Sequence, residues 1–401
     1  MSDDENKDES KHNDNQSEKE EDILKNLNLS INDKKSYDNE EKDDENQKEE
    51  INNKYIKKYK SDSRLYGITF QSSIESDIIN FAVSSLNISK DNNISLLSFK
   101  QEEIDDEEDE DKGNKENKGE SNINNIEDTD LGTIKLKSEV KCEFPVSSIL
   151  FSPHEQNKNL LISTSDLLNL YSYENERLYL KVAFERKYKD FCGPLTSCDW
   201  SRANNAIIGV SSVDKTCSIL DLNKLEEKYM IIAHDKEVYD ISLGQDEFIF
   251  MSTGADGSVR LFDSRQANSS SIIFETNNAA MTRLKWNLVN PNFILIVTVD
   301  KNLIYILDQR KLSYPYGVLK VHKDVVNNAI WAPQSNTNLI SVSDDKSALI
   351  WDIYSDDSNK PEEYIMEYKA ENEIENVAWG DVTQNWIGLI DGNQAEILRI
   401  Q

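Results

Sequence analysis

The stretch Ile232-Ala-His-Asp-Lys-Glu-Val-Tyr-Asp-Ile241 and, after a short connector, Met251-Ser-Thr-Gly-Ala-Asp-Gly-Ser-Val-Arg-Leu-Phe-Asp-Ser-Arg265 decides the fold. It contains three apolar or alternating runs of strand length, Val238 to Leu243, Phe248 to Thr253 and Ser258 to Phe262. A tight Ala-Asp-Gly turn separates the second run from the third. This order predicts an antiparallel sheet with a histidine before its first strand and an aspartate at the end of its third.

The same unit recurs along the chain in three registers. Terminal aspartates follow a large apolar residue at intervals of 42, 45 and 44 residues, at Asp221, Asp263, Asp308 and Asp352. A turn aspartate stands seven residues before three of them, at Asp214, Asp256 and Asp345. A tryptophan closes several first strands, at Trp200, Trp286, Trp331 and Trp379. Units of roughly 40 to 45 residues in this order are typical of WD40 repeats, so the sequence predicts an all-β, seven-bladed WD40 β-propeller.

The chain of 401 residues has a net charge of -30, which is concentrated in two segments. Residues 1–50 hold 19 acidic and 8 basic side chains, and residues 101–130 hold 14 and 3. Both segments are almost free of aromatic residues, so they bury too little apolar surface to offset the entropy of ordering a chain. We therefore predict a disordered acidic tail at 1–50, a propeller at 54–401, and a disordered acidic insert at 101–130 between blades one and two.

The apolar runs place the seven blades at about 64–99, 146–173, 184–222, 232–265, 272–310, 318–353 and 364–400. The last run, Glu396 to Ile400, leaves no residues for an outer strand, and an open sheet edge is a liability. The segment Lys54 to Lys60 alternates tyrosine with lysine and has the length to supply that strand. Its lysines also fit a nuclear-import signal, but the alternation favours a closing edge strand.

Histidine and aspartate in these units resemble catalytic residues, yet their repetition favours a structural role. In a WD40 blade the histidine before the first strand, a serine or threonine of the second, the turn aspartate and the tryptophan of the third bond to one another. Blade six supplies His322, Ser341 or Ser343, Asp345 and Trp351. Blade four supplies His234, Ser252 or Thr253, and Asp256, with Phe262 in place of the tryptophan, and Asp214 is the turn aspartate of blade three. A buried polar network is tolerated only when it is complete, so we predict that these residues stabilise the blades.

The sequence indicates no catalytic, cofactor-binding or metal-binding site. It lacks a phosphate loop, a nucleophile elbow and a His-Glu-x-x-His helix, and its four cysteines show no paired spacing for zinc. A net charge of -30 disfavours direct nucleic-acid binding through phosphate repulsion. No apolar run approaches the roughly 20 residues that span a bilayer. We expect protein partners, no cofactor, no direct nucleic acid and no membrane.

Several motifs are similar to one WD40 family, the scaffold proteins known in plants as Transparent Testa Glabra and in animals as cullin-4-associated factors that bind dual-specificity kinases. The most specific is Asp190-Phe-Cys-Gly-Pro-Leu-Thr-Ser-Cys-Asp-Trp200, close to that family's Asp-Phe-Cys-x-Pro-Leu-Thr-Ser-x-Asp-Trp. Ile232 to Ile241, Gly254 to Arg260 and Ala348-Leu-Ile-Trp-Asp-Ile353 agree as well. The resemblance is dense over 180–401, faint over 55–175 and absent over 1–50.

The resemblance implies a non-enzymatic adaptor for a dual-specificity kinase or for transcription factors. It also implies a second role as a substrate receptor of a cullin-4 ubiquitin ligase, whose adaptor docks on a motif like Trp-Asp-x-Arg. Phe262-Asp-Ser-Arg265 and Leu307-Asp-Gln-Arg310 match that motif except at the aromatic. Arg265 and Arg310 are therefore candidate contacts, because a desolvated arginine contributes strongly to an interface. The alternative is that each forms a solvated ion pair with a nearby aspartate, which contributes little.

Residues at the starts of the first strands are the candidates for a partner-binding face, because loops on a rigid ring carry binding. They are Asp235, Glu237, Tyr239, Val325, Asn327, Glu373 and Glu375. The alternative is that each only shapes the start of its blade. We expect a monomer within larger complexes, in the cytoplasm and nucleus. A WD40 enzyme and a peroxisomal import receptor are the competing classes, disfavoured by the lack of a catalytic constellation and by the Asp190 to Trp200 motif respectively.

Overall fold

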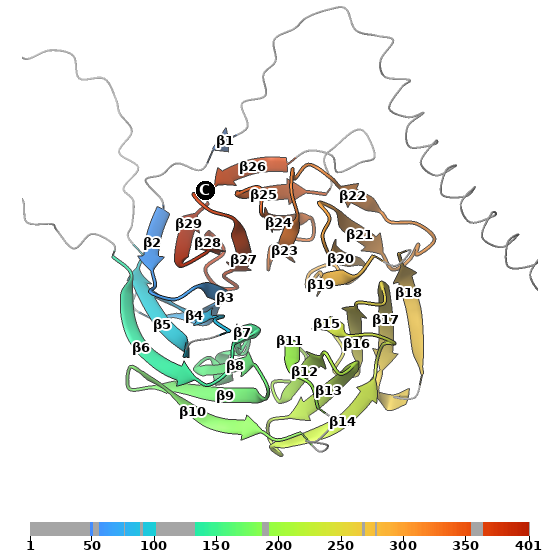
Figure 1. The fold of residues 1–401 in the computed structure, drawn as a ribbon, viewed down its shortest axis with the longest axis horizontal. Helices are drawn as coiled ribbons and strands as arrows, with labels where there is room; N and C mark the ends of the chain where they lie inside the picture. The colour runs from blue at the N-terminus through green and yellow to red at the C-terminus, as the bar shows by residue number, and fades with distance from the viewer. Residues whose placement is uncertain are drawn as a thin grey trace, which may run out of the picture. The chain divides into compact units, whose positions relative to one another are not determined.

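Seven mainly antiparallel sheets surround a central axis, each with its innermost strand toward the centre of the ring (Figure 1). The computed structural model describes residues 49–50, 56–75, 77–88, 91–101, 133–186, 192–266, 269–276, 279–353 and 364–400. Over these residues the predicted all-β, seven-bladed propeller is confirmed, and two short 3₁₀ segments, η3 (Glu155–Asn157) and η5 (Ser264–Gln266), accompany the strands. The predicted disordered tail and insert lie outside the described residues, apart from residues 49–50 and 101.

Most blades are formed by four strands that follow one another in the chain. The strands of blades one to four are β3 (Leu65–Glu75), β4 (Ile78–Ser85), β5 (Asn92–Lys100) and β6 (Lys135–Cys142); β7 (Ser148–Phe151), β8 (Leu160–Thr164), β9 (Leu168–Glu174) and β10 (Arg177–Phe184); β11 (Leu195–Trp200), β12 (Ile207–Ser212), β13 (Thr216–Asp221) and β14 (Glu226–Ile232); and β15 (Val238–Leu243), β16 (Ile249–Gly254), β17 (Ser258–Asp263) and β18 (Ser270–Glu275).

The remaining three blades differ in where their outermost strands come from. Blade five has β19 (Met281–Trp286), β20 (Phe293–Thr298), β21 (Ile304–Asp308) and β22 (Gly317–Leu319). Blade six has β23 (Val326–Trp331), β24 (Asn338–Ser343), β25 (Ser347–Asp352) and β26 (Tyr364–Lys369), with β1 (Glu49–Glu50) parallel to β26. Blade seven has β27 (Ile374–Trp379), β28 (Trp386–Asp391), β29 (Gln394–Arg399) and β2 (Ile56–Lys60).

The outer strands correct the predicted blade boundaries. The sequence placed residues 272, 318 and 364 at the starts of blades five, six and seven. In the structure β18 pairs with β17, β22 with β21 and β26 with β25, so each outer strand completes the preceding blade. The physical reason is the antiparallel ladder, which a chain forms most readily with the strand just before it.

The position of the acidic insert is corrected in the same way. We predicted it between blades one and two, but β6 pairs with β5, with Ser95 opposite Glu139. The chain between Gln101 and Thr133 therefore joins the third strand of blade one to its fourth. Hydrogen bonding along eight residues of β6 decides this assignment, and the apolar pattern of the first three strands did not reveal it.

The N-terminal strand closes the ring as the alternation of tyrosine and lysine predicts. Strand β2 pairs antiparallel with β29, with Ile56 opposite Leu398 and Lys60 opposite Gln394. Lys54 and Tyr55 of the predicted segment lie outside the described residues. Because β2 covers the last strand of the chain, blade seven does not expose the edge of β29.

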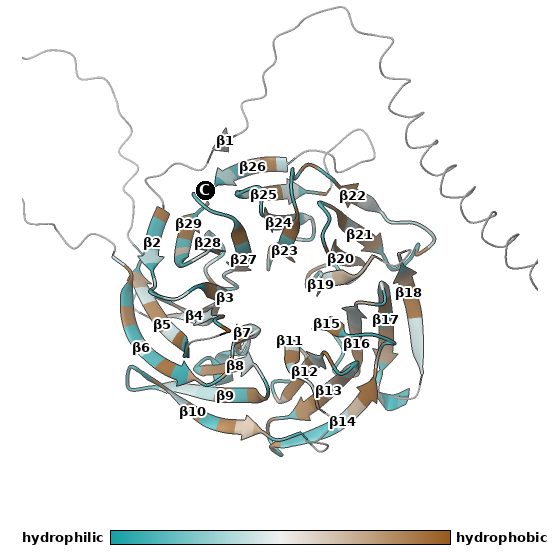
Figure 2. Cartoon of the chain, in the orientation of Figure 1, coloured by the Kyte–Doolittle hydropathy of each residue, from teal (hydrophilic) through white to brown (hydrophobic). Residues whose placement is uncertain are grey.

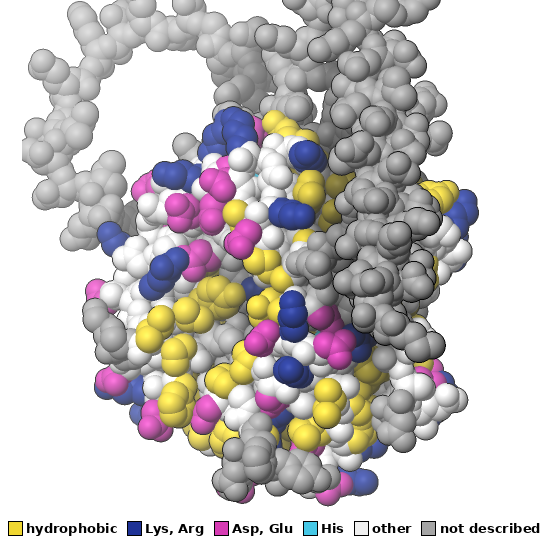
Figure 3. Space-filling view, turned by 45° about the vertical axis from the view of Figure 1, so that its right-hand side comes forward, with side chains coloured by type: hydrophobic (Ala, Val, Ile, Leu, Met, Phe, Trp, Pro, Cys, Tyr) yellow, Lys and Arg dark blue, Asp and Glu magenta, His cyan; other side chains and the backbone are white. Residues whose placement is uncertain are grey.

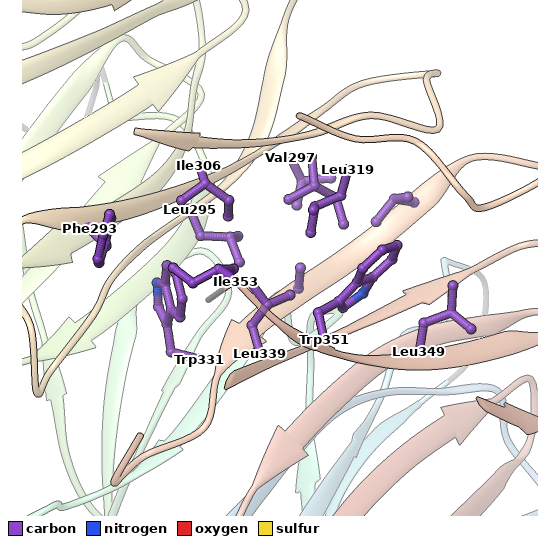
Figure 4. Close-up of a cluster of buried hydrophobic side chains, with 13 residues drawn as sticks. Phe293, Leu295, Val297, Ile306, Leu319, Trp331, Leu339, Leu349, Trp351 and Ile353 are labelled. Atoms are coloured by element: carbon purple, nitrogen blue, oxygen red, sulfur yellow. The ribbon is translucent and has the colours of Figure 1, made fainter. Parts of the chain in front are cut away.

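Hydrophobic clusters fill the spaces between neighbouring blades. Figure 4 shows the cluster between blades five and six, where Phe293 and Leu295 of β20 lie beside Trp331 of β23, and Trp351 of β25 belongs to the same cluster. Trp351 is fully buried. Strand β6, on the outside of the ring, alternates hydrophilic and hydrophobic residues (Figure 2), as expected for a sheet with one solvated side. Packing between blades, more than within them, therefore makes up the core.

Side chains of the innermost strands also join each blade to the next. The backbone N–H groups of Leu243 and Leu284 donate to Asp199 (2.7 Å) and Asp240 (2.9 Å) of the preceding blade. The amide of Asn328 donates to Asn376 at 2.6 Å, and Asn376 donates to the carbonyl oxygen of Tyr66 at 2.9 Å, which links blade seven to blade one. These contacts hold the first strands at fixed positions around the axis.

Candidate functional site

Blade six contains a continuous series of hydrogen-bonded polar side chains, from His322 before its first strand to Trp351 on its third. The indole N–H of Trp351 donates to Ser341 Oγ at 2.8 Å, and Ser341 Oγ lies 2.7 Å from His322 Nε2. The other nitrogen of this imidazole, His322 Nδ1, lies 3.0 Å from Asp345 Oδ2. A neutral imidazole that donates from Nδ1 and accepts at Nε2 satisfies every member. Of the two serines that the sequence offered, Ser341 is the one in contact.

The pKa of Asp345, the carboxylic acid in this hydrogen-bonded series, is strongly shifted. Burial alone would raise the pKa of Asp345, but hydrogen bonds from His322 and Ser347 and from the backbone N–H of Lys323 hold it well below its usual range. His322 itself is only 3% exposed. An imidazole this buried and bonded at both nitrogens has no free position for a substrate.

Blade four repeats the arrangement without the tryptophan. His234 Nδ1 lies 2.9 Å from Asp256 Oδ1, and His234 Nε2 lies 2.8 Å from Ser252 Oγ. Phe262 occupies the tryptophan position and stacks on Phe250, with ring centroids 5.0 Å apart and planes at 9°. Ser252 therefore lacks the indole donor that Ser341 has in blade six.

Blade three reveals a residue that sequence reasoning missed. Asp214 has no histidine partner; instead Arg186 Nη1 lies 2.8 Å from Asp214 Oδ2, and Arg186 Nη2 donates to Thr216 Oγ1 at 2.9 Å. Arg186 is 6% exposed. It follows β10 and lies nine residues before Leu195, where the first strand of blade three begins, and His322 likewise precedes the first strand of blade six. The sequence pattern that could have indicated Arg186 is a basic residue ahead of the turn aspartate in a repeat that has no histidine.

The upper face of the ring, defined as the face on which the innermost strands begin, carries a cavity of about 550 Å³. All seven blades contribute to its lining, through the starts of β3, β7, β11, β15, β19, β23 and β27. Five of the seven predicted partner-face residues lie in this lining: Tyr239, Val325, Asn327, Glu373 and Glu375. The structure therefore brings together side chains from blades four, six and seven that are up to 136 positions apart in the chain.

The other two predicted residues lie on the same face outside the lining. Asp235 is exposed and accepts a hydrogen bond from Arg260 Nη2 at 2.7 Å. Glu237 is exposed beside the start of β15. Neither is placed to contact a group held within the cavity.

Charged groups of the cavity are arranged around Arg64. Its Nε donates to Glu375 Oε1 at 2.8 Å, and its Nη2 bonds to the same oxygen. Asn327 Nδ2 donates to Asp344 Oδ1 at 2.6 Å. On the surface shown in Figure 3, Lys and Arg are interspersed with Asp and Glu and with hydrophobic side chains.

A second cavity of about 240 Å³ lies further along the same innermost strands and shares Ser147 and Arg283 with the first. The ends of the first strands line it with large aromatic residues: Phe151, Trp200, Trp286, Trp331 and Trp379. Arg202 of blade three and Asp381 of blade seven, both in this lining, form an ion pair at 2.8 Å. This pair ties two non-adjacent blades together at the lower face, where the first strands end.

Arg265 and Arg310 occupy equivalent places on the lower face of blades four and five. Each guanidinium forms paired hydrogen bonds with the aspartate two residues before it: Arg265 Nη2 to Asp263 at 2.6 Å and Arg310 Nη2 to Asp308 at 2.6 Å. Their side chains are 56% and 58% exposed. The guanidinium of Arg265 also lies 5.0 Å from the centroid of the Phe248 ring. Both arginines are thus held in defined orientations on the surface.

The part of the chain that the structure describes holds no group of three or more His, Cys, Asp or Glu arranged to bind a metal ion. Over the same residues there is no helix with the length and apolar character needed to cross a membrane. The four cysteines are not joined in disulfides.

Residues 225–263 and 313–352 match the WD40 family, described as WD domain, G-beta repeat. The first matched stretch runs from the outer strand β14 through β17, and the second ends with β25. A sequence repeat thus combines the outer strand of one blade with three strands of the next. The repeats and the ring define a WD40 propeller, a class of protein-interaction adaptor.

Comparison with known proteins narrows the family. The chain is 37% identical over 273 residues to the DDB1- and CUL4-associated factor 7 homolog of Dictyostelium discoideum, across 65% of this chain and 83% of that protein. It is 27% identical over 336 residues to an uncharacterized WD repeat-containing protein of Schizosaccharomyces pombe, across 66% and 77%. It is 31% identical over 251 residues to a WD repeat-containing protein of Saccharomyces cerevisiae, across 53% and 48%. The chain belongs to the WD40-repeat family of the DDB1- and CUL4-associated factor 7 homolog.

Proposed function

We propose that this chain is a non-enzymatic scaffold that brings a protein kinase or a transcription regulator to its partner. The observation that carries the proposal is the upper-face cavity, which collects Tyr239, Val325, Asn327, Glu373 and Glu375 at the axis of a rigid ring. Concave sites that combine apolar walls with a few polar groups are where proteins hold their ligands. The motifs shared with the Transparent Testa Glabra and kinase-binding scaffolds support the same class of partner.

The non-enzymatic part of the proposal rests on the two histidines most suited to catalysis. His234 and His322 are 1% and 3% exposed, and each is bonded at both ring nitrogens within its own blade. A general base must reach the proton that it removes. We expect the protein to act as a monomer within larger complexes in the cytoplasm and nucleus.

Affinity purification of the tagged chain from its source cells, followed by mass spectrometry, tests this proposal. The Tyr239→Ala, Val325→Ala double variant removes two walls of the cavity, and Tyr314→Ala removes an aromatic side chain that is 64% exposed outside its lining. We expect wild type and Tyr314→Ala to recover the same kinase or transcription regulator, and the cavity variant to lose it. Retention of that regulator by a correctly folded cavity variant would contradict a role for this face.

A second candidate function, as substrate receptor of a cullin-4 ligase, is favoured by Arg265 and Arg310. The name of the Dictyostelium relative associates that protein with DDB1 and CUL4. The two arginines lie in equivalent positions on neighbouring blades with their guanidiniums oriented by Asp263 and Asp308. An adaptor that desolvates both would gain from this preorganisation.

The same purification tests the second candidate with an Arg265→Ala, Arg310→Ala variant. Lys311→Ala, which removes an exposed positive charge beside Arg310, is the matched control. We expect the double variant to lose a cullin-4 adaptor and to keep the regulator that binds the upper face. If neither wild type nor control recovers an adaptor, the ligase role falls and the scaffold role is judged on the upper face alone.

A further inference from the structure

The upper-face cavity contains more carboxylates than its own cations neutralise. Its acidic lining residues are Asp300, Asp344, Glu373 and Glu375, and its basic ones are Arg64 and Arg283, which leaves a local charge of -2. This imbalance occurs at the axis, where residues of several blades converge. Carboxylates that converge on one site repel one another unless a cation lies between them.

The contact between Arg64 and Glu375 shows how a cationic side chain binds to the carboxylates of this cavity. Arg64, from blade one, reaches Glu375 of blade seven with two of its nitrogens. The hydrogen bond to Glu375 and its charge raise the pKa of Arg64, burial opposes this, and the charges of Glu373 and Asp344 add to it. The negative charges of three carboxylates thus act on a single guanidinium, and the hydrogen bonds of that guanidinium go to Glu375.

Arg283 does not supply the missing charge at the mouth. Its Nη2 donates to the hydroxyl of Tyr66 at 2.7 Å, and it lies where the upper and lower cavities meet. Arg283 is the innermost cation of the upper cavity. The negative charge of Asp240, which lines the lower cavity, helps to raise the pKa of Arg283. Glu373, at the start of blade seven, and Asp300, in blade five, are exposed.

The remaining walls combine apolar and aromatic side chains with hydroxyl groups and the amide of Asn327. Leu86, Leu195, Val299 and Val325 line the cavity together with the rings of Tyr66 and Tyr239. A side chain with an aliphatic stem and a cationic tip satisfies both parts of such a lining, because the stem covers apolar surface while the tip meets carboxylates. Lysine and arginine are the side chains of this kind.

We propose that the upper-face cavity binds an arginine or lysine side chain of an extended partner segment, with its stem against Val299, Val325 and Tyr239 and its charge beside Glu373 and Asp344. The proposal rests on the scaffold function and names the chemistry of the partner at the same site. Residues on either side of the bound cation lie across the starts of the first strands. An acidic or neutral segment is disfavoured by the local charge.

Binding of fluorescein-labelled nonapeptide pools to the full chain tests the proposal by fluorescence anisotropy. The pools share randomised uncharged residues and differ only at the centre, which is Arg, Lys, Gln or Glu. We expect the Arg or Lys pool to bind roughly tenfold more tightly than the Gln pool, and the Glu pool to bind least, with a preference that weakens as salt is added. Equal affinity for the Arg, Lys and Gln pools, or no binding by any pool, would overturn the cation site.

A pair of matched variants locates the site. Glu373→Gln removes the charge of one exposed carboxylate of the cavity, whereas Glu237→Gln makes the same chemical change on the same face outside the lining. We expect Glu373→Gln to reduce the preference for the cationic pools several-fold and Glu373→Lys to abolish it, with Glu237→Gln unchanged. A preference that survives Glu373→Lys would place the basic segment elsewhere and overturn the assignment.

The outcome is separable from that of the scaffold proposal. If the Tyr239→Ala, Val325→Ala variant loses its cellular regulator while the pools show no preference for a cation, the scaffold stands and the cation site falls. If that variant keeps its regulator and Glu373→Lys keeps its peptide preference, both are overturned.

Discussion

The ammonium group of Lys58 lies 2.7 Å from the carboxylate of Glu396, whose side chain is fully buried. Lys58 belongs to β2 and Glu396 to β29, so this ion pair joins the strand that closes the ring to the last strand of the chain. Tyr368 donates to the other Glu396 oxygen at 2.6 Å. Burial lowers the pKa of Lys58, but hydrogen bonds to Glu396 and Glu371 outweigh it and raise the pKa to about 12.

Removing this lysine will weaken the closure of the ring. Lys58→Met leaves a buried carboxylate without its cation, and because Lys58 is itself partly exposed we expect a loss of about 2 to 3 kcal/mol in the free energy of unfolding. Urea denaturation followed by tryptophan fluorescence measures it. Lys60→Met, on the same strand, is the control, with an expected change within about 0.5 kcal/mol. Equal effects from both substitutions would show that the ion pair does not hold the strand.

Asp391 makes the stability of blade seven depend on pH. Burial, and then the neighbouring charge of Glu396, raise its pKa from 3.8 to about 6. The folded protein therefore keeps a proton on Asp391 in the window between these values, where the unfolded chain has released it. The contribution of protonated Asp391 to the free energy of unfolding is fully present below the unfolded pKa and is lost as the pH rises through the folded pKa.

The Asp391→Asn variant isolates that contribution. We expect its free energy of unfolding, minus that of wild type, to increase by up to about 2 kcal/mol as the pH rises from about 4 to about 7. Urea denaturation of both proteins across this range provides the comparison. A difference that stays constant with pH would mean that Asp391 titrates in the folded protein as it does in the unfolded chain.

The turn aspartates of blades three and six have different partners, so we expect their removal to lower the free energy of unfolding by different amounts. Asp345→Ala leaves Nδ1 of the His322 imidazole without its acceptor, for which we expect a loss of about 1 to 3 kcal/mol. Asp214→Ala leaves the buried guanidinium of Arg186 without its carboxylate, for which we expect about 3 to 5 kcal/mol. Chemical denaturation of the two variants tests the order. An unchanged unfolding curve for Asp345→Ala, or a smaller effect at Asp214, would contradict these roles.

The tryptophan position of blades four and six offers a reciprocal test. Trp351→Phe removes the indole N–H that donates to Ser341, so we expect a loss of about 1 to 2 kcal/mol from the hydrogen bond and the reduced packing. Phe262→Trp supplies the missing donor beside Ser252 and should stabilise blade four by up to about 1 kcal/mol. Thermal and urea unfolding measure both. Destabilisation by Phe262→Trp would show that stacking on Phe250 outweighs the new hydrogen bond.

Much of the fold followed from local sequence patterns. Strand β15 was predicted with the bounds Val238 to Leu243 that the structure shows, and β17 differs only by Asp263. The contacts of His322 with Asp345 and of Trp351 with a serine of the second strand also followed from the repeat. The outer strands were misassigned because hydropathy along a strand reports its burial and not the neighbour with which it forms hydrogen bonds.

The candidate site was less accessible to sequence reasoning. The starts of the first strands indicated Tyr239, Val325 and Glu375, but nothing in their spacing indicated Arg64, which pairs with Glu375 from 311 residues away. Arg186 was also missed, because it replaces a histidine that the repeat would lead one to expect. Asp235 and Glu237 were predicted on the partner face because they also lie at the start of a first strand. Of the three residues predicted in blade four, Tyr239 lines the cavity and these two do not.

The sequence by itself determined the repeat, its turns and the strand that closes the ring, because each depends on residues within one blade or on an alternation that a strand must have. Only the tertiary structure decided which side chains meet at the axis and which carboxylates exceed the cations there. The physical reason is ring closure. Seven blades, each about 40 residues apart in the chain, present one end of their first strands to a common space, so the charge of that space depends on all of them at once.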